Sequence, residues 1–419
     1  MMRFAYLVSA AALVLAPGAL AQSPEQVAEA ALEAAPVFDG HNDVPIQLRG
    51  RWRNMIGDFD FVDTTDTGPE HSEKRTMHTD LNRLREGKVG AQFWSVYVSA
   101  ALPEPEAVQA TIEQIDVTRR LIARYPDDLA LALTADEVEA ALAEGRIASL
   151  MGMEGGYSIG SSLAVLRQMY ALGARYMTLT HSTTLSWADS ATDDPVHGGL
   201  TDFGENVVRE MNRIGMLVDL SHVSEGTMSD ALDVSAAPVI FSHSGARAIN
   251  GHARNVPDAI LRRLPENGGV VMVVGLPGYL GEEARQWYAR REAEDARLST
   301  LWQGQPERVE AGLAEWDAAN PEPATTVSDM ADHIDHIREV AGIDHIGIGG
   351  DYDGMPTGPV GMEDVSGYPA LFVELARRGY GQEDLEKIAM RNVLRAMRGA
   401  EAVAAAQAEM QPIETPVTD

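Results

Sequence analysis

The 419-residue sequence contains no cysteine. This absence excludes disulfide bonds, thiolate catalysis and cysteine-based zinc sites, so the fold must be held by its core and by any bound metal. Basic residues are also scarce, with 33 against 63 acidic ones, and the formal net charge is −30. Such an acidic surface repels nucleic acid phosphates and anionic lipids, and we therefore expect neither as a partner.

The sequence has no apolar run long enough to span a membrane. A short apolar run at residues 5–15 follows the positive charge of Arg3 and precedes the small-x-small site Ala19-Leu20-Ala21. This order predicts a signal peptide at residues 1–21, cleaved after Ala21, and hence export to a bacterial periplasm or secretion. Residues 401–419 are polar and acidic, so we expect a C-terminal tail with no membrane anchor.

Eight short apolar runs alternate with helix-like stretches along most of the chain. Near-continuous apolar runs are typical of parallel strands that are buried on both faces. Residues 108–124, 163–172 and 204–214 carry apolar side chains at helical spacing. The alternation predicts a single α/β domain, a (β/α)8 TIM-like barrel, over residues 22–400. The runs are Pro36–Phe38, Val89–Val98, Ile147–Met151, Tyr176–Leu179, Met216–Leu220, Val239–Phe241, Val270–Val274 and His345–Ile348.

An open doubly wound sheet is the alternative fold, but the first run is not followed by a phosphate-binding glycine fingerprint. Two long segments interrupt the alternation. Residues 50–80 are polar, and residues 279–326, between the seventh and eighth runs, are charged and helix-forming. Extra length at one face of a barrel forms a lid, a dimer contact or a solvated helix pair. The sequence leaves these alternatives open, and with them a homodimer.

Metal-binding or proton-transferring side chains follow six of the eight runs. The active site of a (β/α)8 barrel forms at the carboxyl ends of its strands, so these side chains are expected to converge. Taken singly, each has a structural alternative, such as a capped turn for His41 and Asp43 or a helix N-cap for Asp351. The candidates, in order, are His41 and Asp43, Glu154, His181, His222, His243 and Asp351.

The types of these residues favour a two-metal site. His41 and Asp43 are two residues apart, so in extended backbone their side chains face the same side. Imidazoles and carboxylates without thiolates suit zinc or another first-row divalent ion. Three histidines and two carboxylates exceed the needs of one tetrahedral ion, so we expect two ions with Glu154 between them. Two ions ~3.5–4 Å apart can share a water molecule and deliver hydroxide at neutral pH.

Two charged residues are candidates for handling a substrate. Arg254 either clamps a substrate carboxylate or forms a surface salt bridge with Asp258. Asp351 could take a proton from the attacking water and pass it to a leaving amine. His333 and His336 are expected to be structural, because they lie on a predicted outer helix. No role is assigned to the loop histidines His71, His78, His197 and His252.

Seven motifs in this sequence resemble those of the membrane (renal) dipeptidase family of zinc metallopeptidases, over about residues 38–398. The resemblance implies an amidohydrolase-type (β/α)8 barrel that holds two zinc ions. It also implies hydrolysis of dipeptides with an L- or a D-residue at the C-terminal position. The motifs are Asp39–Asp43, Glu154–Gly156, Leu179–Ser182, Asp219–Ser224, Phe241–Ser244, Arg254–Asp258 and Gly349–Gly354.

The resemblance implies that His41, Asp43 and Glu154 hold one zinc ion, and that Glu154, shared between the ions, holds the second with His222 and His243. Roles in catalysis and substrate binding follow in the same way. His181 would stabilise the oxygen that becomes negative in the tetrahedral intermediate, Arg254 would bind the terminal carboxylate of the dipeptide, and Asp351 would handle the proton near the free amine.

The sequence also departs from the mammalian members of that family. They have cysteines and a C-terminal lipid anchor, so a disulfide-linked, membrane-held dimer is not expected here. Residues 274–279 differ from the family's Asn- and Tyr-containing stretch, which leaves the preference for substrate side chains unpredicted.

Two other functions stay open: a metallohydrolase of another amide or ester, which has no need of Arg254, and a non-catalytic binder, which has no need of Asp351. We expect an exported two-zinc dipeptidase.

Overall fold

A computed structural model describes residues 22–67 and 76–415. The expected signal peptide and its cleavage site, as well as His71, lie outside the described residues. Within those two ranges, none of the helices combines the length and the apolar character needed to cross a bilayer.

A closed parallel barrel forms the centre of the fold. Its strands pair in the order β2-β1-β9-β8-β7-β6-β5-β4-β3, and β2 also pairs with β4. The second pairing closes a ring of eight strands and leaves β3 outside the ring, paired with β4. The predicted (β/α)8 barrel is therefore confirmed. The strands are β1 Val37–Asn42, β2 Val89–Ser95, β3 Leu129–Leu131, β4 Ile147–Glu154, β5 Ala174–Thr178, β6 Leu217–Asp219, β7 Ile240–Ser244, β8 Val270–Val274 and β9 Ile346–Gly349.

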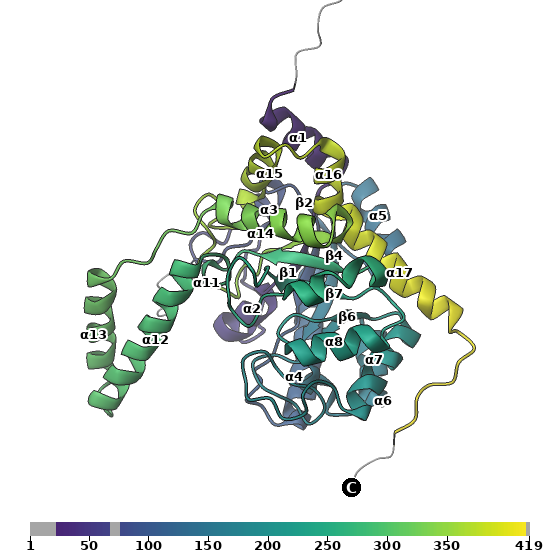
Figure 1. Cartoon of the computed structure of the whole chain (residues 1–419), viewed down its shortest axis with the longest axis horizontal. Helices are drawn as coiled ribbons and strands as arrows, with labels where there is room; N and C mark the ends of the chain where they lie inside the picture. Colours follow the sequence, from purple (N-terminus) through teal and green to yellow (C-terminus); the bar gives the residue numbers. More distant parts are fainter. Residues whose placement is uncertain (1–21, 68–75, 416–419) are drawn as a thin grey trace, which may run out of the picture.

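Helices surround the barrel (Figure 1). α4, α6 and α7 coincide with the three stretches of helical spacing. The expected C-terminal tail from residue 401 begins inside α17, which continues to Ala406. The α-helices are α1 Pro24–Ala34, α2 Val44–Trp52, α3 Leu81–Glu86, α4 Glu104–Arg124, α5 Ala135–Ala143, α6 Leu163–Leu172, α7 Asp202–Ile214, α8 Glu225–Val234, α9 Asp258–Leu261, α10 Leu264–Asn267, α11 Pro277–Leu280, α12 Glu282–Leu301, α13 Pro306–Ala319, α14 Val327–Val340, α15 Tyr368–Arg377, α16 Gln382–Glu386 and α17 Asn392–Ala406.

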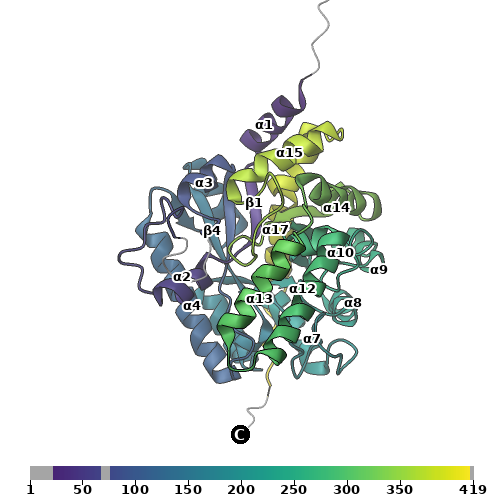
Figure 2. The same cartoon turned by 90° about the vertical axis from the view of Figure 1, so that its left-hand side faces the viewer.

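The long segment between the last two strands of the barrel is helical, as predicted. Its helices α12 and α13 form a hairpin that projects from one side of the barrel (Figure 1) and lies in front of it in the perpendicular view (Figure 2). Trp287 joins the two helices, because its indole N–H donates to the Asn320 carbonyl at 2.7 Å. A bidentate pair between Arg291 and Asp317, at 2.8 and 2.9 Å, adds to this contact.

The interior of the barrel is filled with aromatic rings beneath its carboxyl end. The rings of Phe38 and Phe93 stack at 5.4 Å, and Tyr176 lies 4.9 Å from Phe93. Gly152 makes room for Tyr176, because a Cβ atom at Gly152 would lie 2.0 Å from that ring. These side chains form an apolar layer beneath the polar residues at the strand ends.

Candidate active site

The polar strand ends enclose a cavity of about 360 Å³ at the mouth of the barrel. His41 lies beneath the cavity and is fully buried. Strands β2 and β8, which end without a predicted candidate, contribute Tyr97 and Tyr279 through the segments that follow them. The predicted residues that line the cavity are Asp43, Glu154, His181, His222, His243, Arg254 and Asp351.

One group of three potential metal ligands is formed by His41, Asp43 and Glu154. His41 Nε2 lies 3.3 Å from Asp43 Oδ2 and 3.4 Å from Glu154 Oε2. Asp43 occupies the N-cap position of α2, but none of the backbone N–H groups of that helix donates to its carboxylate. Asp43 therefore does not cap α2, and its carboxylate faces His41; the side-chain caps in this motif come from Asp39 and Asn42, which accept from the His41 and Val44 backbone N–H groups.

A second group is formed by Glu154, His222 and His243. Glu154 Oε1 lies 3.1 Å from His222 Nε2 and 3.3 Å from His243 Nε2, and the two Nε2 atoms are 2.9 Å apart. Glu154 thus belongs to both groups, with Oε2 facing His41 and Oε1 facing the other two histidines.

The donor atoms in both groups have the spacing of ligands around a shared ion. Two ligand atoms that bind one tetrahedral zinc ion at ~2.0–2.1 Å lie ~3.3 Å apart, and the distances above are close to that value. His41 Nε2 also has no hydrogen-bond partner among the described residues, although it is buried between two carboxylates. A buried polar atom without a partner is costly, and a cation would remove that cost. The residues therefore fit a metal ion in each group.

The electrostatics of the group formed by Glu154, His222 and His243 favour metal binding as well. Burial, together with the nearby charge of Arg254, lowers the pKa of His222 well below its ordinary value, and burial with the charge of His41 does the same for His243. Burial opposes ionisation of Glu154, but His41 and hydrogen bonds from His222 and His243 outweigh this effect and hold its pKa well below the usual range. Neutral imidazoles and an ionised carboxylate are the forms that bind metal ions.

The remaining ring nitrogens of two histidines are held by buried hydroxyl groups. Tyr176 Oη lies 2.8 Å from His41 Nδ1, and Ser242 Oγ lies 2.8 Å from His243 Nδ1. Ser242 Oγ in turn donates to Asp219 Oδ2 at 2.7 Å. Contacts of this kind fix the orientation of metal-binding histidines. The sequence did not reveal the roles of Tyr176 or Ser242, because a hydroxyl residue in or next to an apolar run has no distinguishing signal.

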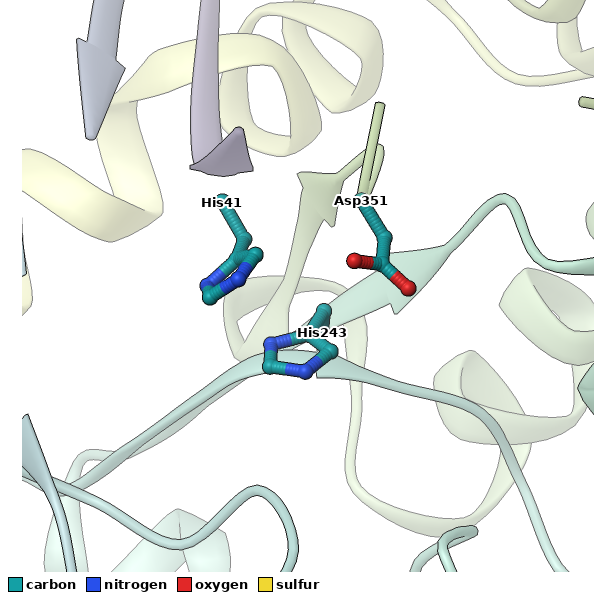
Figure 3. A group of neighbouring side chains, drawn as sticks. All are labelled: His41, His243 and Asp351. Carbon is teal, nitrogen blue, oxygen red and sulfur yellow. The ribbon is translucent and has the colours of Figure 1, made fainter. Parts of the chain in front are cut away.

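Asp351 lies next to both groups. Its carboxylate and ring nitrogens of His41 and His243 lie within 4.8 Å of one another, and their side chains converge from three strand ends (Figure 3). Asp351 has a left-handed backbone with φ of 63°, a conformation that costs free energy in a non-glycine residue. The residues that follow, 352–364, form no helix, so the N-cap alternative is wrong.

Burial and the charges of Asp43 and Glu154 raise the pKa of Asp351 well above its usual range, even though His41 lowers it. A raised pKa makes this carboxylate a better proton acceptor, as expected of a general acid–base group.

Arg254 is buried beside the cavity, with an exposed fraction of 1%. Its Nη1 donates to Ser244 Oγ at 3.4 Å and its Nη2 to the His243 carbonyl at 3.2 Å, and its Nε has no partner among the described residues. Its partners are thus neutral oxygens, which leaves a buried positive charge able to bind an anion.

The alternative of a surface salt bridge between Arg254 and Asp258 is wrong. Asp258 pairs instead with Arg262 at 3.2 Å and with His336 at 2.7 Å. His333, which lies on the same helix as His336, is also structural, because it accepts a hydrogen bond from the Ala246 N–H at 2.8 Å.

His181 lies at the outer edge of the cluster. Its ring stacks on His222 at 4.2 Å, and its Nε2 is 3.9 Å from Glu154 Oε1. The centres of the Tyr97 and His181 rings are 4.9 Å apart. Burial and the charges of Glu154 and Asp43 raise the pKa of Tyr97 to about 12, so its hydroxyl remains protonated and can donate a hydrogen bond into the cavity.

Comparison with known proteins identifies the family. Residues 25–411 match the membrane dipeptidase family, peptidase family M19. Dipeptidase 3 of Rattus norvegicus is 42% identical over 384 residues, which cover 90% of this chain and 68% of the relative. Dipeptidase tcpJ of Claviceps purpurea is 40% identical over 385 residues, which cover 90% of this chain and 79% of the relative. The chain belongs to the membrane dipeptidase family.

Solved structures show the same fold. A probable dipeptidase from Pseudomonas aeruginosa superimposes with a TM-score of 0.76 at 24% identity, over 91% of this chain and 99% of that one. A metallopeptidase from Rhodobacter sphaeroides, crystallised with a phosphinate mimic of the dipeptide L-Ala-D-Ala, gives a TM-score of 0.69 at 24% identity, over 87% of this chain and 99% of that one. The resemblance inferred from the motifs is confirmed. The chain is a metallo-dipeptidase, which rules out a non-catalytic binder.

Proposed function

We propose that this metallo-dipeptidase holds two zinc ions, one bound by His41, Asp43 and Glu154 and the other by Glu154, His222 and His243. The observation that carries the proposal is the position of Glu154, whose two oxygens face different histidines within 3.1–3.4 Å. A carboxylate placed in this way suits a bridge between two ions. When bound, the two ions would polarise the scissile carbonyl and supply hydroxide at neutral pH.

The residues around the metal groups would position the dipeptide. Arg254 would bind the terminal carboxylate through its guanidinium group, whose present partners are neutral oxygens. His181, at the edge of the cluster, would donate a hydrogen bond to the carbonyl oxygen as that oxygen gains negative charge. Asp351 would accept a proton from the attacking water and deliver it to the leaving amine.

We further propose that the C-terminal residue of the substrate is accepted in either the L- or the D-configuration. The support is the Rhodobacter sphaeroides metallopeptidase of the same fold, which was crystallised with a mimic of L-Ala-D-Ala. We also propose export after cleavage at Ala21, supported by the order of Arg3, the apolar run and the small-x-small site. Sequencing the N-terminus of the exported protein should then return Gln22 first.

An assay with a panel of L,L- and L,D-dipeptides, with and without a chelator, tests the proposed activity. We expect metal-dependent release of free amino acids from substrates of both configurations. Failure to hydrolyse any dipeptide, together with hydrolysis of a lactam or lactone, would favour a metallohydrolase of another amide or ester.

A further inference from the structure

A second cavity, of about 390 Å³, adjoins the first. Both cavities are lined by Leu276 and Tyr279, so these two residues form the wall between them. The far side of the second cavity is formed by the base of α12, including Tyr288 and Ala289. The helical hairpin therefore approaches the active site with its base and encloses space next to it.

This shared wall lies beside Arg254. The guanidinium carbon of Arg254 is 5.5 Å from the centre of the Tyr279 ring. The His252 ring is tilted against the same ring, with the ring centres 4.3 Å apart, and its Nδ1 accepts a hydrogen bond from the backbone N–H of Arg254 at 3.1 Å. A carboxylate bound by Arg254 would therefore lie next to Tyr279. The side chain of the residue that bears this carboxylate starts from the adjacent carbon atom, beside the Tyr279 ring that lines both cavities.

The chemistry of the second cavity favours an apolar occupant. The charge of Arg285 is already compensated, because Glu282 binds it through two contacts of 2.7 and 2.5 Å. Burial, together with the charges of Arg254, Arg285 and Arg247, lowers the pKa of His252 to about 4, so its ring is neutral at pH 7. Aromatic and aliphatic side chains supply much of the remaining lining, from Leu276, Tyr279, Tyr288, Ala289 and Pro356.

We propose that this second cavity is the subsite for the side chain of the C-terminal residue of the substrate, and that it selects large apolar side chains, aromatic ones above all. The inference rests on the proposed dipeptidase mechanism and adds a substrate class to it. Pockets lined by aromatic and aliphatic groups select for apolar side chains that fill them. The α12–α13 hairpin, which is an addition to the (β/α)8 barrel, would thus determine which side chains the enzyme accepts.

The test is to fill the second cavity from its outer side. Ala289→Trp places a bulky ring in the cavity from an exposed position on α12, and Ala293→Trp is the matched control, one turn further along the helix and outside the lining of either cavity. kcat/KM is measured for L-Ala-L-Ala, L-Ala-L-Phe and L-Ala-L-Lys, and thermal melting checks that both variants are folded.

We expect the wild type to prefer L-Ala-L-Phe. Ala289→Trp should lower kcat/KM for that substrate at least about tenfold while changing that for L-Ala-L-Ala by less than about twofold. Ala293→Trp should change kcat/KM for neither substrate.

Unchanged hydrolysis of L-Ala-L-Phe by Ala289→Trp, or an equal loss on both substrates, would overturn the proposed subsite but not the proposed dipeptidase function. If Ala289→Trp lost activity selectively on L-Ala-L-Lys, the apolar character of the subsite would be overturned, since the exposed Glu292 of its lining would then bind the substrate side chain. A wild type inactive on all three dipeptides would reject the proposed function itself, and the subsite with it.

Discussion

Asp351 and Arg254 share a cavity with the metal-binding groups but differ in what surrounds them. Asp351 lies within reach of two histidine nitrogens, whereas Arg254 is a buried cation whose partners are neutral oxygens. Asp351 could therefore act as a proton carrier or as a metal ligand, whereas the surroundings of Arg254 suit it to binding an anion. Both residues can be tested by a change that keeps the size of the side chain.

Asp351→Asn keeps the shape of the side chain but removes its ability to carry a proton. General acid–base groups contribute about 10²–10⁴-fold to a rate, so we expect kcat to fall at least about 100-fold. Metal content, measured by inductively coupled plasma mass spectrometry, should equal that of the wild type. A variant that loses an equivalent of metal would show Asp351 to be a ligand instead of a proton carrier.

Arg254→Met keeps the length of the side chain but removes its charge. Hydrogen bonds to charged groups contribute about 1.5–3 kcal/mol, so we expect kcat/KM for dipeptides to fall on the order of 10- to 100-fold. The wild type should also prefer a free C-terminal carboxylate to a C-terminal amide, and the variant should lose this preference. If Arg254→Met retains the preference, the carboxylate is recognised elsewhere.

The sequence predicted the candidate metal ligands and the proton carrier because each of them lies shortly after the end of an apolar run. His222 and His243 are examples, since polar groups at such positions have no role in packing a barrel. Tyr97 and Tyr176 could not be found in this way, because tyrosine is common in buried strands and only the fold shows which hydroxyl meets a histidine. The neutral environment of Arg254 was equally hidden, since Asp258 follows it by only four residues and offers a plausible partner.

Helix α14 is joined to the loop after β7 by one neutral histidine. His333 accepts a hydrogen bond from the Ala246 N–H at 2.8 Å through Nδ1 and donates to the Leu280 carbonyl at 3.0 Å through Nε2. Burial lowers the pKa of His333 from 6.5 to about 4. Protonation would place a second proton on Nδ1 and break the contact with Ala246.

Acid should therefore destabilise the protein through His333. The unfolded chain binds a proton at His333 below about pH 6.5 while the folded protein does not, so this contribution to stability is lost as the pH falls from about 6.5 to 4. For a pKa shift of this size the loss is about 2 kcal/mol at pH 5. His333→Asn retains an acceptor but cannot titrate. In metal-free protein, urea unfolding should show the stability advantage of the wild type shrinking by that amount between pH 7.5 and 5, whereas a pH-independent difference would contradict this role.

The pattern of apolar runs predicted eight strands and the helical nature of the insert, since burial on both faces and helical spacing leave clear traces. It missed β3, which pairs outside the ring. The apolar stretch 129–133 that contains β3 is made of leucine and alanine, which favour helices, and so gave no clear signal of a strand. It could not determine the position of the α12–α13 hairpin either, because charged helices pack through a few contacts such as that of Trp287 with Asn320. A sequence pattern does not specify which surface such contacts face.

The whole molecule carries a formal charge of −30, and its site concentrates three carboxylates, those of the buried Asp43 and Glu154 and of the half-buried Asp351. Divalent cations would offset the repulsion among them, so metal binding should stabilise the folded state. We expect removal of metal by a chelator to lower Tm by on the order of 5 °C. Calorimetry before and after zinc is restored measures this change, and a Tm that is independent of metal would argue against ions bound between these carboxylates.

The central claim is that Glu154 lies between two ions at the mouth of the barrel. Anomalous diffraction from crystals of the zinc-loaded protein, recorded at the zinc absorption edge, tests it most directly. The account predicts two peaks ~3.5–4 Å apart, one beside His41 and Asp43 and the other beside His222 and His243. A single peak, or two peaks that do not share Glu154, would contradict it.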